Sequence, residues 1–214
     1  SGDDKVKPLP GGGLVSFNNN VRISSNDGTI LCVLANFPRY FCYMSSFPHS
    51  TIFLRYINDQ IQFAKKLSVP AMELLKFRLD SSGKYGWDIE ARLRDQGFAN
   101  NIETRQKSLL KRLSECRICI ATYNATVFIE TFVANIPTMI FWRPEYNELR
   151  PSAKPYFDVL KQVGILHDSP DSAAALLNRI CEDPLKWWNQ EEIQNAKSKF
   201  CLQYANINNH WKSD

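Results

Sequence analysis

Short apolar runs are the feature of this sequence that most restricts its fold. One covers residues 30–34, and the segments 117–121 and 138–142 each follow one polar residue with four apolar ones. Runs of this kind are typical of strands that are buried on both faces of a sheet. The segments between them, such as Thr51–Leu67, repeat apolar residues at helical spacing. This alternation indicates βαβ units, so we predict a Rossmann-like doubly wound parallel sheet in an α/β fold, with helices on both faces.

The same patterns place the other elements. Further strands are predicted at residues 72–77 and 164–166, helices at 87–94, 108–113, 127–134, 152–163 and 169–180, and a C-terminal helical tail at 184–211. Residues 1–28 are predicted to be a flexible lead-in with a candidate hairpin at 14–23, and residues 29–214 a Rossmann-like domain with C-terminal helices. Ligands of such sheets bind beyond the carboxyl ends of the strands, near the switch in strand order. The loops after residues 35, 78, 121 and 142 are therefore the expected binding regions.

Composition excludes several classes of protein. Hydrophobic residues make up 44% and charged residues 22% of the chain, which fits a packed domain and not a disordered chain or a coiled coil. The net charge of +4 is too small for a dedicated nucleic-acid binder. No apolar run approaches the length of about 18–20 residues that crosses a bilayer, and the N-terminus lacks the apolar segment of a signal peptide. The opening Ser1-Gly2, without an initiator Met, is consistent with an excised piece of a longer protein.

The cysteines favour a structural role. Cys116 and Cys119 have the spacing of a redox or metal-binding pair, but they lie in a predicted buried strand, with no second pair and no histidine at ligand spacing. We interpret them as buried thiols of a protein from a reducing compartment. The same interpretation covers the other cysteines, which are Cys32, Cys42, Cys181 and Cys201. No metal is expected, since no Asp-x-Asp follows a predicted strand.

The sharpest candidate site is the loop from Thr122 to Thr126, which leads from a predicted buried strand into a helix. The first N–H groups of that helix and the positive end of its dipole suit a phosphate, with the two threonine hydroxyls as added donors. Glu130 lies four residues after Thr126, so both face the same side, where a carboxylate can accept hydrogen bonds from ribose hydroxyls. The structural alternative makes Thr122 or Asn124 the helix N-cap and leaves Glu130 facing solvent.

Three further loops carry candidate contacts to a donor sugar or an anion. Basic side chains can pair with a phosphate or a sugar carboxylate, and aromatic rings can stack on a base or a sugar. The candidates are Asn36 and Arg39 after the first strand, Arg78, Lys84, Tyr85 and Trp87 after the second, and Glu148 and Arg150 after the fourth.

Each of these candidates has a structural alternative. Arg39 is then a surface arginine, Trp87 a core anchor, and Glu148 the ion-pair partner of Arg150. Asp168, in a triad-like His-Asp-Ser sequence, is interpreted as an N-cap.

Three stretches carry a resemblance to a known family. The sequence ATYNATVFIETFVANIPTMIFW at residues 121–142, with residues 148–157 and 163–170, resembles a bacterial family of surface-carbohydrate (O-antigen) transferases. Residues 36–40 and 85–87 are similar to further motifs of that family, so the resemblance spans residues 30–182. Lys84 departs from its pattern, which carries an acid there. The family is similar in turn to the two-domain GT-B glycosyltransferases, including the retaining β-Kdo transferases that use CMP-Kdo.

The resemblance implies the C-terminal-type half of a GT-B glycosyltransferase. It assigns phosphate contacts to Thr122, Asn124, Ala125 and Thr126, places Tyr123 in the same nucleotide-binding loop, and assigns the ribose contact to Glu130. It further implies a nucleotide-sugar donor such as CMP-Kdo with no separate cofactor, and a glycan acceptor of surface polysaccharide or lipopolysaccharide synthesis. The protein would work in the cytoplasm at the inner face of the bacterial membrane, with an N-terminal partner domain outside this chain. The catalytic residue and the stereochemical outcome are left open.

Other residues bear on two alternative functions. The first is a non-catalytic Rossmann-like module that binds a partner protein through the aromatic tail, which holds Trp187, Trp188 and Trp211. The second, an NAD-linked dehydrogenase, is disfavoured because no Gly-x-Gly-x-x-Gly follows a predicted strand.

Overall fold

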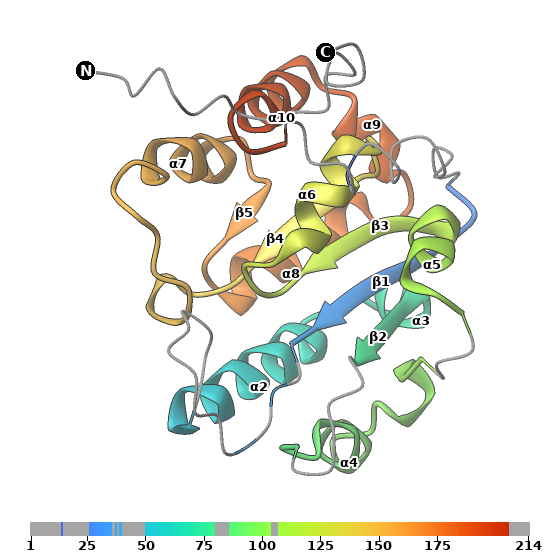
Figure 1. The fold of residues 1–214 in the computed structure, drawn as a ribbon. Helices are drawn as coiled ribbons and strands as arrows, with labels where there is room; N and C mark the ends of the chain where they lie inside the picture. The colour runs from blue at the N-terminus through green and yellow to red at the C-terminus, as the bar shows by residue number, and fades with distance from the viewer. Residues whose placement is uncertain are drawn as a thin grey trace.

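A parallel sheet of five strands forms the centre of the protein (Figure 1). The computed structural model describes residues 14, 26–35, 37, 39, 50–79, 86–103 and 107–205. The strands are β1 (Thr29–Leu34), β2 (Leu75–Leu79), β3 (Cys116–Ala121), β4 (Thr138–Phe141) and β5 (Leu166–His167). They are ordered β2-β1-β3-β4-β5, and every adjacent pair is parallel. This architecture confirms the predicted Rossmann-like α/β fold.

Helices cover both faces of the sheet, which explains the continuous apolar runs. On one face α2 (Ser50–Lys65) and α3 (Val69–Leu74) pack against α8 (Pro170–Ile180). On the other face lie α5 (Leu109–Glu115), α6 (Thr126–Val133) and α7 (Lys154–Gln162) (Figure 1). The C-terminal α10 (Glu191–Tyr204) packs on α6 and α7, and α9 (Pro184–Trp188) contacts β3.

The strand order creates a switch point between β1 and β3. The chain leaves β1 through α2 toward one edge of the sheet and leaves β3 through α6 toward the other edge. The loops that follow these two strands therefore separate, and this is where ligands of doubly wound sheets bind. The loop at residues 122–125 lies at this point, as the sequence predicts.

Beyond β2 the sheet ends in a single bridge. After α4 (Ile89–Asp95) and η1 (Ala99–Asn101), Ile102 forms a parallel bridge with Phe77, and the Glu103 N–H donates to the Phe77 carbonyl at 2.9 Å. This bridge occupies the place of an additional edge strand.

Three predicted elements differ clearly from the structure. The strand predicted at residues 164–166 is β5, at Leu166–His167. Residues 72–74 belong to α3 and not to a strand, because Pro70 at the start of the helix favours a helical turn there. The predicted C-terminal helix is broken at Asn189 and Gln190, so it forms α9 and α10. The candidate hairpin lies outside the described residues except for Leu14, which is helical.

The tryptophans of the C-terminal tail lie in the core. Trp188 is 0% exposed, and its ring nitrogen donates to Asn135 Oδ1 at 3.0 Å. Trp187 is also buried, and Phe200 packs edge-on against Phe128 and Phe132. These rings hold α9 and α10 against α6, so they do not form the exposed aromatic surface that the interaction-module hypothesis requires. Trp211 lies outside the described residues.

The described cysteines are free thiols. Cys116 and Cys119 are both buried on β3 in a cluster of apolar side chains, which confirms the prediction that they pack as small hydrophobic residues. Burial raises the pKa of the Cys116 thiol to about 12. Within the described residues, no three or more His, Cys, Asp and Glu side chains group as a metal site would require. Among the described helices, none combines the length and apolar character needed to span a bilayer.

Candidate functional site

Tyr56 on α2 ties the ends of β1 and β3 together. Its hydroxyl accepts a hydrogen bond from the Ala35 N–H at 2.8 Å and lies 2.6 Å from Thr122 Oγ1. Thr122 Oγ1 donates its hydrogen to the Val33 carbonyl at 2.7 Å, so Tyr56 must be the donor to Thr122. Burial raises the pKa of the Tyr56 phenol far above its ordinary value, which keeps this hydrogen in place.

Thr122 consequently has a structural role, because its hydroxyl links the end of β3 to β1 and α2. It is 0% exposed, and its hydroxyl has no hydrogen left to donate to a phosphate. This differs from the predicted phosphate contact by the Thr122 side chain. The N-cap alternative is also wrong, because Ala125 occupies the N-cap position of α6.

The first turn of α6 keeps its N–H groups open. Ala125 has no side-chain oxygen to cap the helix, so the N–H groups of Thr126, Val127 and Phe128 have no acceptor among the described residues. The N–H groups of the two preceding residues, Asn124 and Ala125, already have acceptors within the protein. Asn124 N–H donates to the side chain of Asn147 at 3.0 Å, and Ala125 N–H donates to the Tyr123 carbonyl at 3.0 Å. Anion binding at this loop is therefore confined to the helix itself and to side chains around it.

Thr126 and Glu130 lie on the same side of α6, as their spacing predicts. Burial raises the pKa of the Glu130 carboxyl above its ordinary 4.5, and a hydrogen bond with the Thr126 side chain partly opposes that rise. The half-buried Glu130 is therefore held one turn behind the open N–H groups. A carboxylate in this position can accept hydrogen bonds from neighbouring hydroxyl groups of a ligand.

A row of aromatic rings connects three of the predicted site residues. Tyr123 packs edge-on against Phe37 at 6.2 Å between ring centroids, and Phe37 packs in the same way against Phe53 at 6.3 Å. Phe53 stacks on Trp87 at 5.5 Å, and the exposed Arg39 guanidinium lies 5.2 Å from the Trp87 ring centroid. Trp87 is only 9% exposed, so it is a core anchor that also supports Arg39.

Arg78 is paired within the fold. Its guanidinium lies 2.7 Å from Glu103 Oε1 and also donates to the Lys107 carbonyl at 3.1 Å. Arg112 approaches the other oxygen of Glu103 at 3.0 Å. Glu103 is the residue after Ile102, which bridges to β2. By pairing with Glu103, Arg78 therefore stabilises the edge of the sheet instead of making the predicted anion contact.

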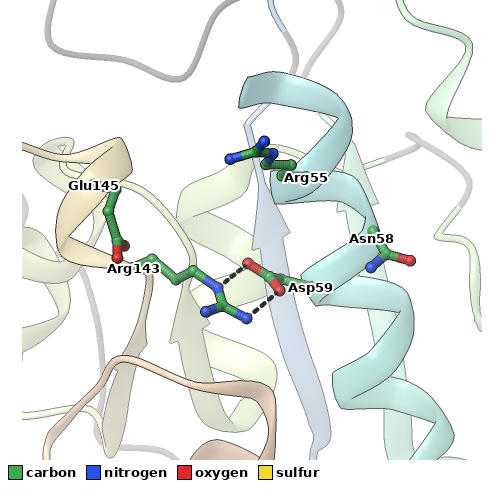
Figure 2. Close-up of a pocket in the computed structure, with 5 residues that line it drawn as sticks. All are labelled: Arg55, Asn58, Asp59, Arg143 and Glu145. Carbon is green, nitrogen blue, oxygen red and sulfur yellow. Dashed lines mark hydrogen bonds and ion pairs between the residues drawn. The ribbon is translucent and has the colours of Figure 1, made fainter. Parts of the chain in front are cut away.

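Sequence reasoning missed a bidentate ion pair in the loop after β4. Arg143 Nε and Nη2 donate to the two carboxylate oxygens of Asp59 at 2.7 and 2.9 Å (Figure 2). Asp59 is buried on α2, so this pair anchors the loop to a helix on the far side of the switch point. A polar cleft of about 280 Å³ opens beside the pair, lined by Arg55, Asn58, Asp59, Arg143 and Glu145. It lies beside the loop after β4 and not at the predicted loop of residues 122–126.

The same loop carries Asn147, which sequence reasoning also missed. It follows η2 (Pro144–Tyr146), and its Oδ1 accepts the hydrogen bond from Asn124 N–H. The signal that could have found it is an amide side chain in a loop that leaves a buried strand. Glu148 and Arg150 are exposed, and no ion pair joins them in the described part of the chain.

The remaining predicted residues divide into two groups. Asn36, Lys84 and Tyr85 lie outside the described residues. Asp168 is not the N-cap of α8. That cap is Ser169, which accepts from the Ser172 N–H at 3.2 Å, because Asp168 pairs with Lys161 instead.

Comparison with known proteins identifies the family of this chain. Residues 1–214 match the family model described as LIC12162 family transferase. No curated protein matches the chain. A match over the whole chain confirms the transferase part of the resemblance. The chain therefore belongs to the LIC12162 family of transferases.

Proposed function

We propose that this transferase is a glycosyltransferase, or the nucleotide-binding domain of one, that binds a nucleotide-activated sugar at the switch point between β1 and β3. The observation that supports this best is the open first turn of α6, at Thr126, Val127 and Phe128, with Glu130 behind it. A phosphate of the donor would accept hydrogen bonds from these N–H groups. The Thr126 hydroxyl, which donates to the Glu130 carboxylate in this structure, would turn to the phosphate when the ligand binds. Glu130 would accept hydrogen bonds from the ribose hydroxyls.

The same arrangement would assist sugar transfer. When the bond between sugar and phosphate breaks, negative charge develops on the leaving phosphate. Fixed N–H groups and the dipole of α6 would stabilise that charge without reorganising. Arg39, supported on Trp87, would supply a cation at the neighbouring loop. Asn36, Lys84, Tyr85, Glu148 and Arg150 stay candidate contacts to the donor.

The substrate follows from the resemblance. A donor such as CMP-Kdo and a glycan acceptor of bacterial surface polysaccharide, lipopolysaccharide or O-antigen synthesis are proposed on that basis. The acceptor site would be completed by an N-terminal domain of the GT-B type outside this chain, with the protein acting at the inner face of the membrane. Nucleotide binding without turnover is then expected of this chain alone.

Calorimetry with CMP, UDP and GDP tests the proposal. We expect one preferred nucleotide, and we expect Thr126→Ala and Glu130→Gln each to weaken its binding about fivefold to tenfold, because each removes one hydrogen bond to the ligand. Glu192→Gln, an exposed position on α10, is the matched control and should bind as the wild type does. Absence of binding by all three nucleotides would refute the proposal.

A further inference from the structure

Asn147 holds a buried hydrogen-bond donor that the fold does not use. Its side chain is 1% exposed, and its Oδ1 accepts the Asn124 N–H. Its Nδ2 has no acceptor within the described residues. A buried amide N–H without a partner is costly, and native proteins rarely keep one without a reason.

The orientation of the Asn147 amide follows from its neighbour. Asn124 N–H needs an acceptor, so the oxygen of the amide must face it and the nitrogen must point away from it. A rotation of the amide by 180° would bring two donors together. Asn124 lies two residues before Thr126, so the amide of Asn147 lies beside the chain that enters α6.

The loop that carries Asn147 is fixed at its base. Arg143 is held by the buried carboxylate of Asp59 (Figure 2), and the Asn147 N–H closes the η2 turn on the Pro144 carbonyl at 3.2 Å. Because both ends of the turn are tied down, the Asn147 side chain is pre-positioned and does not need to be ordered by a ligand.

We infer that Asn147 Nδ2 donates a hydrogen bond to the phosphate of the ligand that binds at the N-terminus of α6. This inference rests on the proposed function, and it makes Asn147 a binding residue for the phosphate. The Asn147 amide is hydrogen-bonded to Asn124, which lies two residues before the first uncapped N–H group of α6, so both kinds of donor belong to the same loop region. A phosphate has enough oxygens to accept from both, whereas a neutral base has no need of the helix dipole.

Asn147→Asp is the sharpest test, because the two side chains have almost the same shape. One carboxylate oxygen still accepts from Asn124 N–H, while the other replaces the free donor by a negative charge. Calorimetry is run with the preferred nucleotide of CMP, UDP and GDP and with its nucleoside. We expect the variant to bind the nucleotide at least about tenfold more weakly and the nucleoside within about twofold of the wild type. Asn195→Asp, exposed on α10, introduces the same charge and should change neither affinity.

A measurement on the wild type makes the test independent of how well the variant folds. In a ¹⁵N-asparagine-labelled protein, the side-chain NH₂ resonance of Asn147 should shift when the nucleotide is added and stay unchanged with the nucleoside. If the wild type binds a nucleotide but this resonance does not move and Asn147→Asp binds equally well, the inference is refuted and the proposed function stands. If the wild type binds none of the three nucleotides, the proposed function fails and the inference fails with it.

Discussion

Replacing Tyr56 by Phe tests whether the hydrogen bonds at the switch point hold the site together. The substitution removes one hydroxyl from a fully buried position and leaves the ring in place. Ala35 N–H then loses its acceptor, and Thr122 loses one donor while it keeps its bond to the Val33 carbonyl.

The structure sets the size of the effect. An unsatisfied buried N–H costs about 1–3 kcal/mol, and the bond from Tyr56 to Thr122 contributes about 0.5–1.5 kcal/mol. We therefore expect Tyr56→Phe to lower the free energy of unfolding by about 2–4 kcal/mol. Because burial raises the pKa of Tyr56, the wild type should lose part of this advantage as the pH rises above about 10, where tyrosines of the unfolded chain ionise.

Urea unfolding followed by tryptophan fluorescence measures the difference. The matched control is Tyr156→Phe on α7, where an exposed hydroxyl donates to Gln203 at 3.2 Å. That variant should stay within about 0.5 kcal/mol of the wild type. If Tyr56→Phe costs no more than Tyr156→Phe, the hydrogen-bond chain does not stabilise the switch point and the reasoning is wrong.

Three further outcomes follow from local packing and charge. Gly28→Ala should lower the free energy of unfolding by at least about 2 kcal/mol, because the new Cβ would lie 2.1 Å from the backbone oxygen of Glu115. A decrease below about 1 kcal/mol, measured by urea unfolding, would contradict this expectation. Glu130→Gln should be at least as stable as the wild type at pH 7, because burial raises the pKa of the Glu130 carboxyl and so makes its ionised form unfavourable in the folded protein. Any gain in stability should vanish below pH 4.5, and thermal unfolding at several pH values measures this dependence. Cys116 and Cys119 should resist iodoacetamide in the folded protein at pH 8, because burial raises the pKa of both thiols; rapid modification seen by mass spectrometry would count against it.

Local patterns were enough to predict the sheet. The apolar runs at residues 30–34 and 138–142 depend only on burial on both faces, and both are strands at nearly the expected bounds. The spacing of Thr126 and Glu130 likewise depends only on helical geometry. The error at residues 72–74 has a local cause too, because Pro70 starts a short helix before an apolar stretch that is compatible with either structure.

Contacts between distant segments could not be predicted in this way. Thr122 looks like a ligand-binding hydroxyl until Tyr56 is found 66 positions away. Arg78 looks free until Glu103 is placed beside it by the Ile102 bridge, and the partner of Arg143 is 84 positions away. A single sequence contains each residue type but not these pairings. The polar side chains of the candidate site could therefore be proposed, but those free to bind a ligand could not be distinguished from those paired within the fold.

The two ends of the sheet bear on how the protein avoids self-association. An edge strand with open backbone groups is a template to which a strand of another molecule can add. Here β5 has two residues, which offers little length for such pairing. The outer side of β2 is occupied at Phe77 by the Ile102 bridge, and it is flanked by the charged side chains of Lys76 and Arg78, both tied to residues beyond the edge. A short strand at one end, and a bridged edge held by hydrogen-bonded and ion-paired side chains at the other, leave little open backbone for a strand of another molecule to pair with.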